Sequence, residues 1–121
     1  MITIDQAVDW VLEHRRGKAF EKYNSQQIEW AISRAINCKG FAFAQLESGK
    51  LIGIICATPN TVEKTLRVHE VLCIDPRALP SMAMAFMQRF HGYAITAKRR
   101  GRERTYRTNR LVQLLSNYEH V

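Results

Sequence analysis

Two segments near the start of the chain carry apolar residues at the spacing of an amphipathic helix. The first has them at positions 4, 7, 8, 11 and 12, and the second at positions 28, 31, 32, 35 and 36. This spacing puts the apolar side chains on one helix face, which is buried against a core. Capping boxes fit the start of both segments, with Thr3 and Gln6 at the first and Asn24 and Gln27 at the second. We therefore predict two N-terminal helices that each pack by one face.

The pattern changes to that of strands in the middle of the chain. Three strands are predicted at residues 41–47, 50–58 and 66–75, followed by a helix at residues 76–92 and a strand at residues 93–98. Ser48-Gly49 is a short polar connection, which predicts a hairpin between the first two strands. A strand, a helix and a second strand make a crossover unit, so the last two strands are predicted to be parallel neighbours. Ligands bind at the carboxyl ends of such strands, which directs attention to residues 73–81.

The strands also differ in how their faces are covered. Residues 51–57 are apolar without alternation, so we expect this strand to be buried on both faces. In the next strand, simple alternation puts positions 66, 68, 70, 72 and 74 on one face, where Glu70 is a carboxylate in an otherwise apolar row. Such a carboxylate needs a partner or has a raised pKa, which makes Glu70 a candidate functional residue; the alternative is a strand-edge glutamate paired with an arginine. Trp10 and Trp30 fall beside the helix stripes, and we expect them at the rim of the core; the alternative is that they line a cleft.

The positive charge of the chain is concentrated in one segment. The 121 residues have a net charge of +7, and residues 98–110 hold one acid and seven basic residues, which are Lys98, Arg99, Arg100, Arg102, Arg104, Arg107 and Arg110. A dense arginine run favours phosphate or an acidic surface, so nucleic acid or an acidic protein is the expected partner. Gly101 and the alternating polar residues predict an exposed, bent extension or hairpin arm. The alternative is a solvated strand end that keeps a small protein soluble.

Length and composition narrow the remaining classes. A chain of this size is expected to form one domain over residues 1–121. No apolar run is long enough to span a membrane, and the first ten residues lack the basic start of a signal peptide. Cys38, Cys56 and Cys73 form no Cys-x-x-Cys pair and lie in apolar contexts, so we expect reduced core thiols in a cytoplasmic protein. The four histidines show no ligand spacing with cysteine, which argues against a structural zinc.

The order helix, helix, strand, strand, strand, helix, strand, short helix resembles the GNAT family of N-acetyltransferases over nearly the whole chain. The resemblance implies an α/β fold of the acyl-CoA N-acyltransferase type. This fold is a mixed sheet with two N-terminal helices, a β-β-β-α-β core and a short C-terminal helix, here at residues 106–116. Size and charge are also similar to small divergent acetyltransferase-like proteins of tailed bacteriophages, some of which are packaged in the virion. On this resemblance the expected location is the cytoplasm, or the virion for a phage-encoded protein.

Members of that family hold the pyrophosphate of acetyl-coenzyme A on the loop before the crossover helix, with the pattern Gln/Arg-x-x-Gly-x-Gly/Ala. Free backbone N–H groups at the helix N-terminus bind the phosphates. Here the pattern aligns with residues 77–82, where Arg77 matches, Pro80 stands at the first glycine and Met82 at the small residue. Proline removes an N–H and methionine blocks close approach, so acetyl-coenzyme A is expected to bind weakly or not at all, although Pro80 suits the first position of a helix. The resemblance implies coenzyme contacts at Cys73, Ile74, Arg77 and Ser81.

The resemblance also implies catalytic positions. Glu70 matches the glutamate that serves as general base for the amine, and Tyr106 is the candidate for the tyrosine that protonates the leaving thiolate, with Tyr118 as the alternative. Three functions stay open: an acetyltransferase-like scaffold that binds protein or nucleic acid without chemistry, an active N-acetyltransferase, and a small basic nucleic-acid-binding domain. The altered coenzyme loop favours the first, Glu70 and Arg77 favour the second, and the basic segment favours the third.

Overall fold

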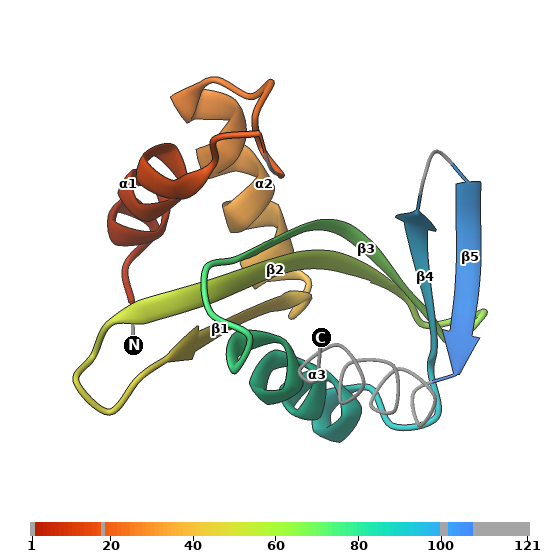
Figure 1. Cartoon of the computed structure of the whole chain (residues 1–121). Coiled ribbons are helices and arrows are strands. Elements are labelled where there is room, and N and C mark those ends of the chain that lie inside the picture. Colours follow the sequence, from red (N-terminus) through yellow and green to blue (C-terminus); the bar gives the residue numbers. More distant parts are fainter. Residues whose placement is uncertain (1, 18, 100–101, 108–121) are drawn as a thin grey trace.

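The computed structural model describes residues 2–17, 19–99 and 102–107, which form a mixed α/β fold. Its helices are α1 (Ile4–His14), α2 (Ser25–Asn37) and α3 (Ala78–Arg89). Its strands are β1 (Phe41–Gln45), β2 (Leu51–Asn60), β3 (Thr65–Cys73), β4 (Ala94–Arg99) and β5 (Arg102–Arg107). In the described part of the chain these strands form one five-stranded sheet in the order β1-β2-β3-β4-β5, in which β3 and β4 are parallel and the other neighbours antiparallel (Figure 1).

The helices cover the two faces of the sheet, with α1 and α2 on one face and α3 on the other (Figure 1). Two clusters of buried apolar side chains result, one under α1 and α2 and one under α3. β2 contributes to both clusters, and its residues 51–57 are all buried, as the unbroken apolar run predicts. Trp10 of α1 is buried and donates a hydrogen bond of 3.0 Å from its indole Nε1 to the backbone oxygen of Leu51, which ties α1 to the start of β2.

Both predicted capping boxes are present. The Thr3 hydroxyl accepts a hydrogen bond from the Gln6 N–H while the Gln6 side chain accepts one from the Thr3 N–H, and Asn24 and Gln27 repeat this pair at α2. After α2 the chain passes so close to β2 that a Cβ on Gly40 would stand 1.9 Å from the backbone oxygen of Ala57. Glycine is therefore required at position 40, where its oxygen accepts a hydrogen bond of 2.7 Å from the Ala57 N–H.

The parallel pair of strands confirms the predicted crossover. β3 and β4 are neighbours linked by α3, and their pairing runs from Thr65 opposite Ala94 to Val68 opposite Ala97. Beyond that point the two strands are not paired, so they part toward their carboxyl ends. α3 is shorter at both ends than the predicted residues 76–92, and Pro80 is its third residue rather than its first. The proline still lies in the first turn, where N–H groups have no partner within the helix.

A bulge in β3 changes the faces predicted for its side chains. The register with β2 shifts between Cys56 and Ala57, which leaves His69 as an extra residue in β3. Leu66 consequently packs in the cluster under α3, whereas Leu72 packs in the cluster under α1 and α2. The prediction that positions 66, 68, 70, 72 and 74 share one face is therefore wrong, because one inserted residue reverses the alternation.

The last described segment is a strand rather than the start of a helix. β5 pairs with β4 from Ala94 opposite Arg107 to Arg99 opposite Arg102, which makes the hairpin arm predicted for the basic segment. The predicted helix is wrong for residues 106 and 107, and the rest of it, residues 108–116, lies outside the described residues. An open strand edge presents backbone N–H and C=O groups, and pairing with β5 satisfies those of β4.

Candidate functional site

A cavity of about 310 Å³ lies between α2 and the strands β2 and β3. It is lined by Tyr23 from the loop before α2, by Gln27, Trp30, Ala31, Arg34 and Ala35 from α2, and by Cys56, Ala57, Thr58, His69 and Glu70 from the strands. Alanine and cysteine side chains supply apolar walls, while acidic, basic, hydroxyl and imidazole groups converge on the same space. A few polar groups over apolar walls are the usual composition of a small-ligand site.

Glu70 is the acidic group of this cavity, and it is half-buried. Its carboxylate accepts hydrogen bonds from the Tyr23 hydroxyl and from the backbone N–H of Phe20. Burial raises the pKa of Glu70 above its ordinary value, and the two hydrogen bonds offset part of that rise. Within the described residues its partners are thus a phenol and a backbone N–H, not the arginine of the alternative interpretation. Burial and the neighbouring Glu70 charge also raise the pKa of Tyr23, which keeps its hydroxyl protonated as a donor.

The loop between α1 and α2 brings the Tyr23 hydroxyl and the Phe20 N–H to Glu70. Phe20 has a left-handed backbone with a φ of +67° and a ring that is only 2% exposed. Its oxygen accepts hydrogen bonds from the Tyr23 N–H at 3.0 Å and from the Arg15 guanidinium at 3.2 Å, and Arg15 also donates to the Tyr23 oxygen. The rings of Phe20 and Tyr23 pack edge to face at 5.8 Å. A buried anchor and an arginine clamp therefore fix the position of the Tyr23 hydroxyl.

His69 is placed beside the cavity by the bulge in β3. Its Nε2 lies 2.7 Å from the Thr58 hydroxyl, with which it shares a hydrogen bond. His69 is an exposed residue, but partial desolvation lowers the pKa of its ring, and the charges of Arg34 and Arg67 lower it further. The imidazole is therefore neutral at pH 7 and offers one donor and one acceptor nitrogen.

Trp30 stands at the mouth of the cavity with 63% of its surface exposed. The Arg34 guanidinium carbon lies 5.3 Å from the centre of its ring, within the range of a cation–π contact. The expectation that both tryptophans lie at the rim of the core is wrong for both: Trp10 is buried in the core, and Trp30 lines the cavity, as the cleft alternative predicts. Sequence spacing alone does not separate them, because both fall next to an apolar stripe.

Cys56 lies in the floor of the cavity opposite Glu70 in the β2–β3 register. Burial raises the pKa of its thiol to about 12, with smaller contributions from Glu70 and Cys38. The thiol is therefore neutral at physiological pH, and it acts as an apolar wall rather than a nucleophile. All three cysteines are free thiols, as expected, although Cys38 and Cys73 are only partly buried.

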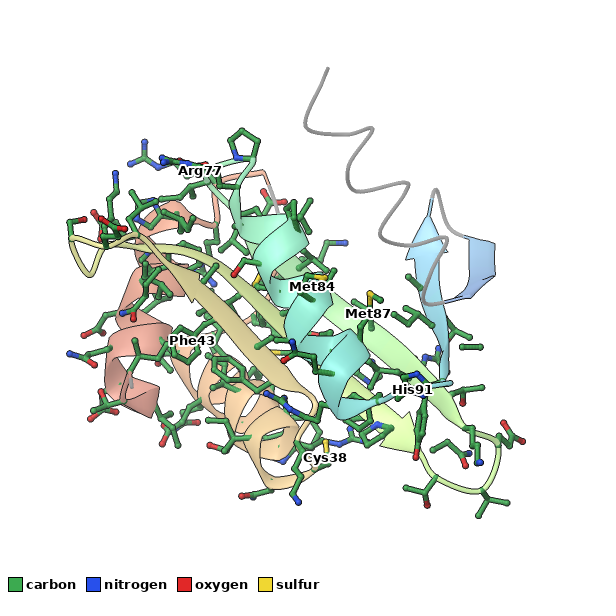
Figure 2. All side chains as sticks on the ribbon, turned by 90° about the horizontal axis from the view of Figure 1, so that it is seen from below. Cys38, Phe43, Arg77, Met84, Met87 and His91 are labelled. Carbon is green, nitrogen blue, oxygen red and sulfur yellow. The ribbon has the colours of Figure 1, made fainter. Side chains whose placement is uncertain are left out.

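The residues predicted to contact a coenzyme lie elsewhere, at the start of α3. Figure 2 shows Arg77 there and His91 beyond the other end of the helix, with Met84 and Met87 on the helix between them. The Asp75 carboxylate accepts three hydrogen bonds from Arg77, at 2.9 Å from its backbone N–H, 3.0 Å from Nε and 2.7 Å from Nη2. These bonds lower the pKa of Asp75 to about 2, so Arg77 is held by a carboxylate of its own loop. The Ile74 N–H, a second group predicted to contact the coenzyme, already donates a hydrogen bond of 3.0 Å to the backbone oxygen of Ile52.

Met82 does not occupy the position that the sequence alignment implied. Its side chain is fully buried in the cluster under α3, and Ser81 is the exposed residue beside it. A Cβ added to Gly53 of β2 would stand 2.8 Å from the Met82 methyl carbon and 2.6 Å from the Ala78 Cβ. The expectation that Met82 blocks approach to the loop is therefore wrong, since this methionine fills the space between α3 and the sheet. Pro80 and the Asp75–Arg77 pair remain as the obstacles to phosphate binding.

The two predicted catalytic residues are not brought together. Tyr106 lies in β5 opposite Ile95 of β4, and Ile95 pairs with Leu66 of β3. Tyr106 is therefore two strands away from β3, and it is level with Leu66 rather than with Glu70. Two strand spacings alone amount to about 10 Å. Tyr118 lies outside the described residues. The tyrosine that does reach Glu70 is Tyr23, which sequence reasoning missed because nothing in its local pattern signals a contact with a strand so far along the chain.

The basic segment is held on the β4–β5 hairpin. Lys98 and Arg99 end β4, while Arg102, Arg104 and Arg107 belong to β5. The register sets Lys98 opposite Glu103 and Arg99 opposite Arg102. The other two basic residues, Arg100 and Arg110, lie outside the described residues. The loop before α3 and the basic hairpin belong to opposite ends of the sheet (Figure 1).

No family model, no curated protein and no solved structure matches this chain. Within residues 2–17, 19–99 and 102–107, no cluster of histidine, cysteine and acidic side chains is arranged to hold a metal ion. Among the described helices, none combines the length and the apolar character that a membrane crossing requires.

Proposed function

We propose that this chain is a binding domain on an acetyltransferase-like sheet, which binds nucleic acid through the β4–β5 hairpin and carries out no acetyl transfer. An acidic protein surface is the alternative partner for the same hairpin. The likeness in size and charge to small phage proteins extends the proposal to a virion component. Three observations support the proposal: the order of the elements, the net charge, and the Asp75–Arg77 pair in the loop before α3.

The basic hairpin is the observation that carries this proposal. Five basic residues and one acid lie on two paired strands, and β5 is the last strand of the described sheet. Arginine dominates this set, and its planar guanidinium matches phosphate oxygens in two-point contacts. Neutralising phosphates releases counterions, which supplies affinity that does not depend on sequence.

The loop before α3 supports a binding role rather than a coenzyme-dependent one. A phosphate group bound there would have to displace the Asp75 carboxylate from Arg77 or lie beside its negative charge. Pro80 contributes no N–H to the first turn of α3, and the Ile74 N–H is already bonded within the sheet. These three features leave few donors for a pyrophosphate.

The test removes charge from the hairpin and compares binding at two salt concentrations. Arg99, Arg100 and Arg102 are replaced by glutamine, and the control variant carries glutamine at the exposed residues Arg16, Lys39 and Lys50, so that the net charge falls equally. Affinity for a single-stranded oligonucleotide is measured at about 50 mM and about 200 mM salt. Each lost phosphate contact should reduce the salt slope by about 0.7, so the hairpin variant should lose up to about 2 and the control almost nothing.

Thermal unfolding of both variants accompanies the binding measurement. Exposed charges contribute little to stability, so both variants should unfold close to the wild type. A hairpin variant that unfolds far below the control, yet binds the oligonucleotide as the wild type does, would show that these arginines are structural. A wild type that binds acidic protein surfaces but no oligonucleotide would select the alternative partner.

An active N-acetyltransferase is the second candidate, and Glu70 favours it. A half-buried carboxylate with a raised pKa, next to a phenol in a cavity, can take a proton from an amine. The reaction also needs acetyl-coenzyme A within reach of that amine. The affinity for this coenzyme therefore separates the two candidates.

A further inference from the structure

We propose that the cavity between α2 and strands β2 and β3 holds one unstacked guanine base of a single-stranded nucleic acid. This inference rests on the proposed nucleic-acid function and names the feature of the strand that the cavity recognises. It uses three side chains that the hairpin proposal leaves without a role, namely Trp30, Arg34 and Glu70.

Trp30 supplies a surface for stacking. Its ring is 63% exposed at the cavity mouth, and the Arg34 guanidinium packs against it at 5.3 Å. Proteins that recognise single strands splay bases out and stack them on aromatic rings or on guanidinium planes. A base that stacks on this indole removes its exposed apolar surface from water.

Glu70 supplies the recognition of one base. An ionised carboxylate accepts hydrogen bonds at about four positions, so acceptor capacity remains beyond the bonds from Tyr23 and Phe20. Guanine presents two neighbouring N–H donors on its pairing edge, which match the two oxygens of a carboxylate. Adenine and cytosine place an acceptor nitrogen next to their amino group, and thymine places a carbonyl oxygen on either side of its single N–H. A carboxylate repels those neighbouring acceptors, so guanine is the base that fits it.

The surrounding charge favours an anionic strand over a cationic ligand. Arg34 lines the cavity, and the protein as a whole carries a net charge of +7. Both would repel a lysine or polyamine that approached Glu70, whereas both attract a phosphodiester. Thr58 and Arg67 are register partners, and Arg67 in turn pairs with Thr96 of β4, so the sheet leads from the cavity to the hairpin. Figure 1 shows β4 and β5 rising from the sheet toward the side that carries α2.

A small set of oligonucleotides tests the inference. The probes are oligothymidines of roughly 12 nucleotides, a length within the site sizes of single-strand binding domains. They carry guanine, adenine, cytosine, thymine or an abasic site at one central position, and dissociation constants are measured by fluorescence anisotropy. The guanine probe should bind the wild type about tenfold more tightly than the all-thymine probe, as expected for one well-placed base contact.

Two variants and two matched controls locate the effect. Glu70→Gln should bring the guanine and all-thymine probes to within about twofold of each other, while the affinity for thymine stays near wild type. Trp30→Ala should weaken every probe about tenfold, the abasic probe included, because any base of the strand can stack on the indole. The controls are Glu63→Gln in the exposed β2–β3 turn and Met84→Ala on the exposed side of α3, and both should bind all probes as the wild type does.

The outcomes separate this inference from the proposed function. Tight, salt-dependent binding that ignores the central base, or a guanine preference that survives Glu70→Gln, overturns the inference and leaves the hairpin proposal standing. A guanine preference that is lost in Glu70→Gln, together with affinities and a salt slope that the hairpin variant leaves unchanged, supports the inference and removes the hairpin from the proposed function. A wild type that binds no probe at low salt rejects both the inference and nucleic acid as the partner of the hairpin.

Discussion

At the scale of single residues, Glu70 is where stability and the proposed base recognition oppose each other. Its pKa is raised in the folded protein above the ordinary value of 4.5, mainly by burial. At pH values between the ordinary pKa of the unfolded chain and the raised pKa of the folded protein, Glu70 is protonated more in the folded state. The free energy of unfolding therefore falls as pH rises through that interval. Above its raised pKa, Glu70 is an ionised carboxylate that burial penalises.

Replacing Glu70 with glutamine should remove this pH dependence. The amide oxygen still accepts from Tyr23 and Phe20, but no buried charge forms above the raised pKa. We expect the variant to be at least as stable as the wild type at pH 7, with no fall in the free energy of unfolding as pH rises from about 4 to about 7. Urea denaturation of both proteins across this range is the measurement. A variant that is less stable by more than about 1 kcal/mol at pH 7 would show that the charge itself holds the loop of Tyr23 in place.

At the scale of elements, the contact between α3 and β2 depends on the absence of a side chain at Gly53. A Cβ there would stand 2.6 Å from the Ala78 Cβ, and the Ala78 side chain has no freedom to move away from it. Gly53→Ala should therefore push the start of α3 off the sheet and lower the free energy of unfolding by about 1–3 kcal/mol. The control is Ser81→Ala on the exposed side of the same helix, which should change stability by less than about 0.5 kcal/mol. Equal effects of the two substitutions in thermal or urea unfolding would contradict this account.

The elements that sequence predicts well are those whose signals are local. The capping boxes at Thr3 and Asn24 and the apolar stripes of α1 and α2 require only neighbouring residues, and the unbroken apolar run of β2 reports burial on both faces. The basic segment predicted an arm, but the bounds of β5 were missed and residues 106 and 107 were predicted as helix, because this arginine-rich sequence has no apolar alternation. It becomes a strand through pairing with β4, which is a tertiary effect.

The candidate site was predicted only in part, because some of its residues carry a local sequence signal and the others are placed by tertiary contacts. Glu70 stands out in the sequence because it is a charge among apolar residues. Its neighbours do not, because the bulge at His69 and the left-handed backbone of Phe20 decide which side chains face it. Neither feature has a sequence signal at those positions, since glycine or asparagine usually marks a left-handed residue and phenylalanine rarely does. The placement of Met82 was mistaken because a sequence pattern does not state which way a helix is turned.

At the scale of the whole molecule, the charge distribution bears on the question of catalysis. Acetyl-coenzyme A carries several phosphates, and a protein with a net charge of +7 attracts any such anion. Attraction of this kind is diffuse and weakens with salt, whereas a built pyrophosphate site uses fixed N–H donors and depends much less on ionic strength. The strongest basic cluster lies on the β4–β5 hairpin and not at the start of α3, where Asp75 already holds Arg77.

We therefore expect acetyl-coenzyme A to bind weakly and without specificity. Calorimetry at about 50 mM and about 200 mM salt should give an affinity no greater than that of adenosine 3′,5′-bisphosphate, and the two affinities should fall together as salt rises. Glutamine at Arg99, Arg100 and Arg102 should weaken both ligands, because the hairpin is the source of the attraction, while Arg77→Gln should change neither. A dissociation constant in the low micromolar range, about −8 kcal/mol, that persists at the higher salt and is lost in Arg77→Gln would instead identify a working coenzyme site. Glu70 would then be the base of an acetyl transfer, and the binding-domain proposal would fail.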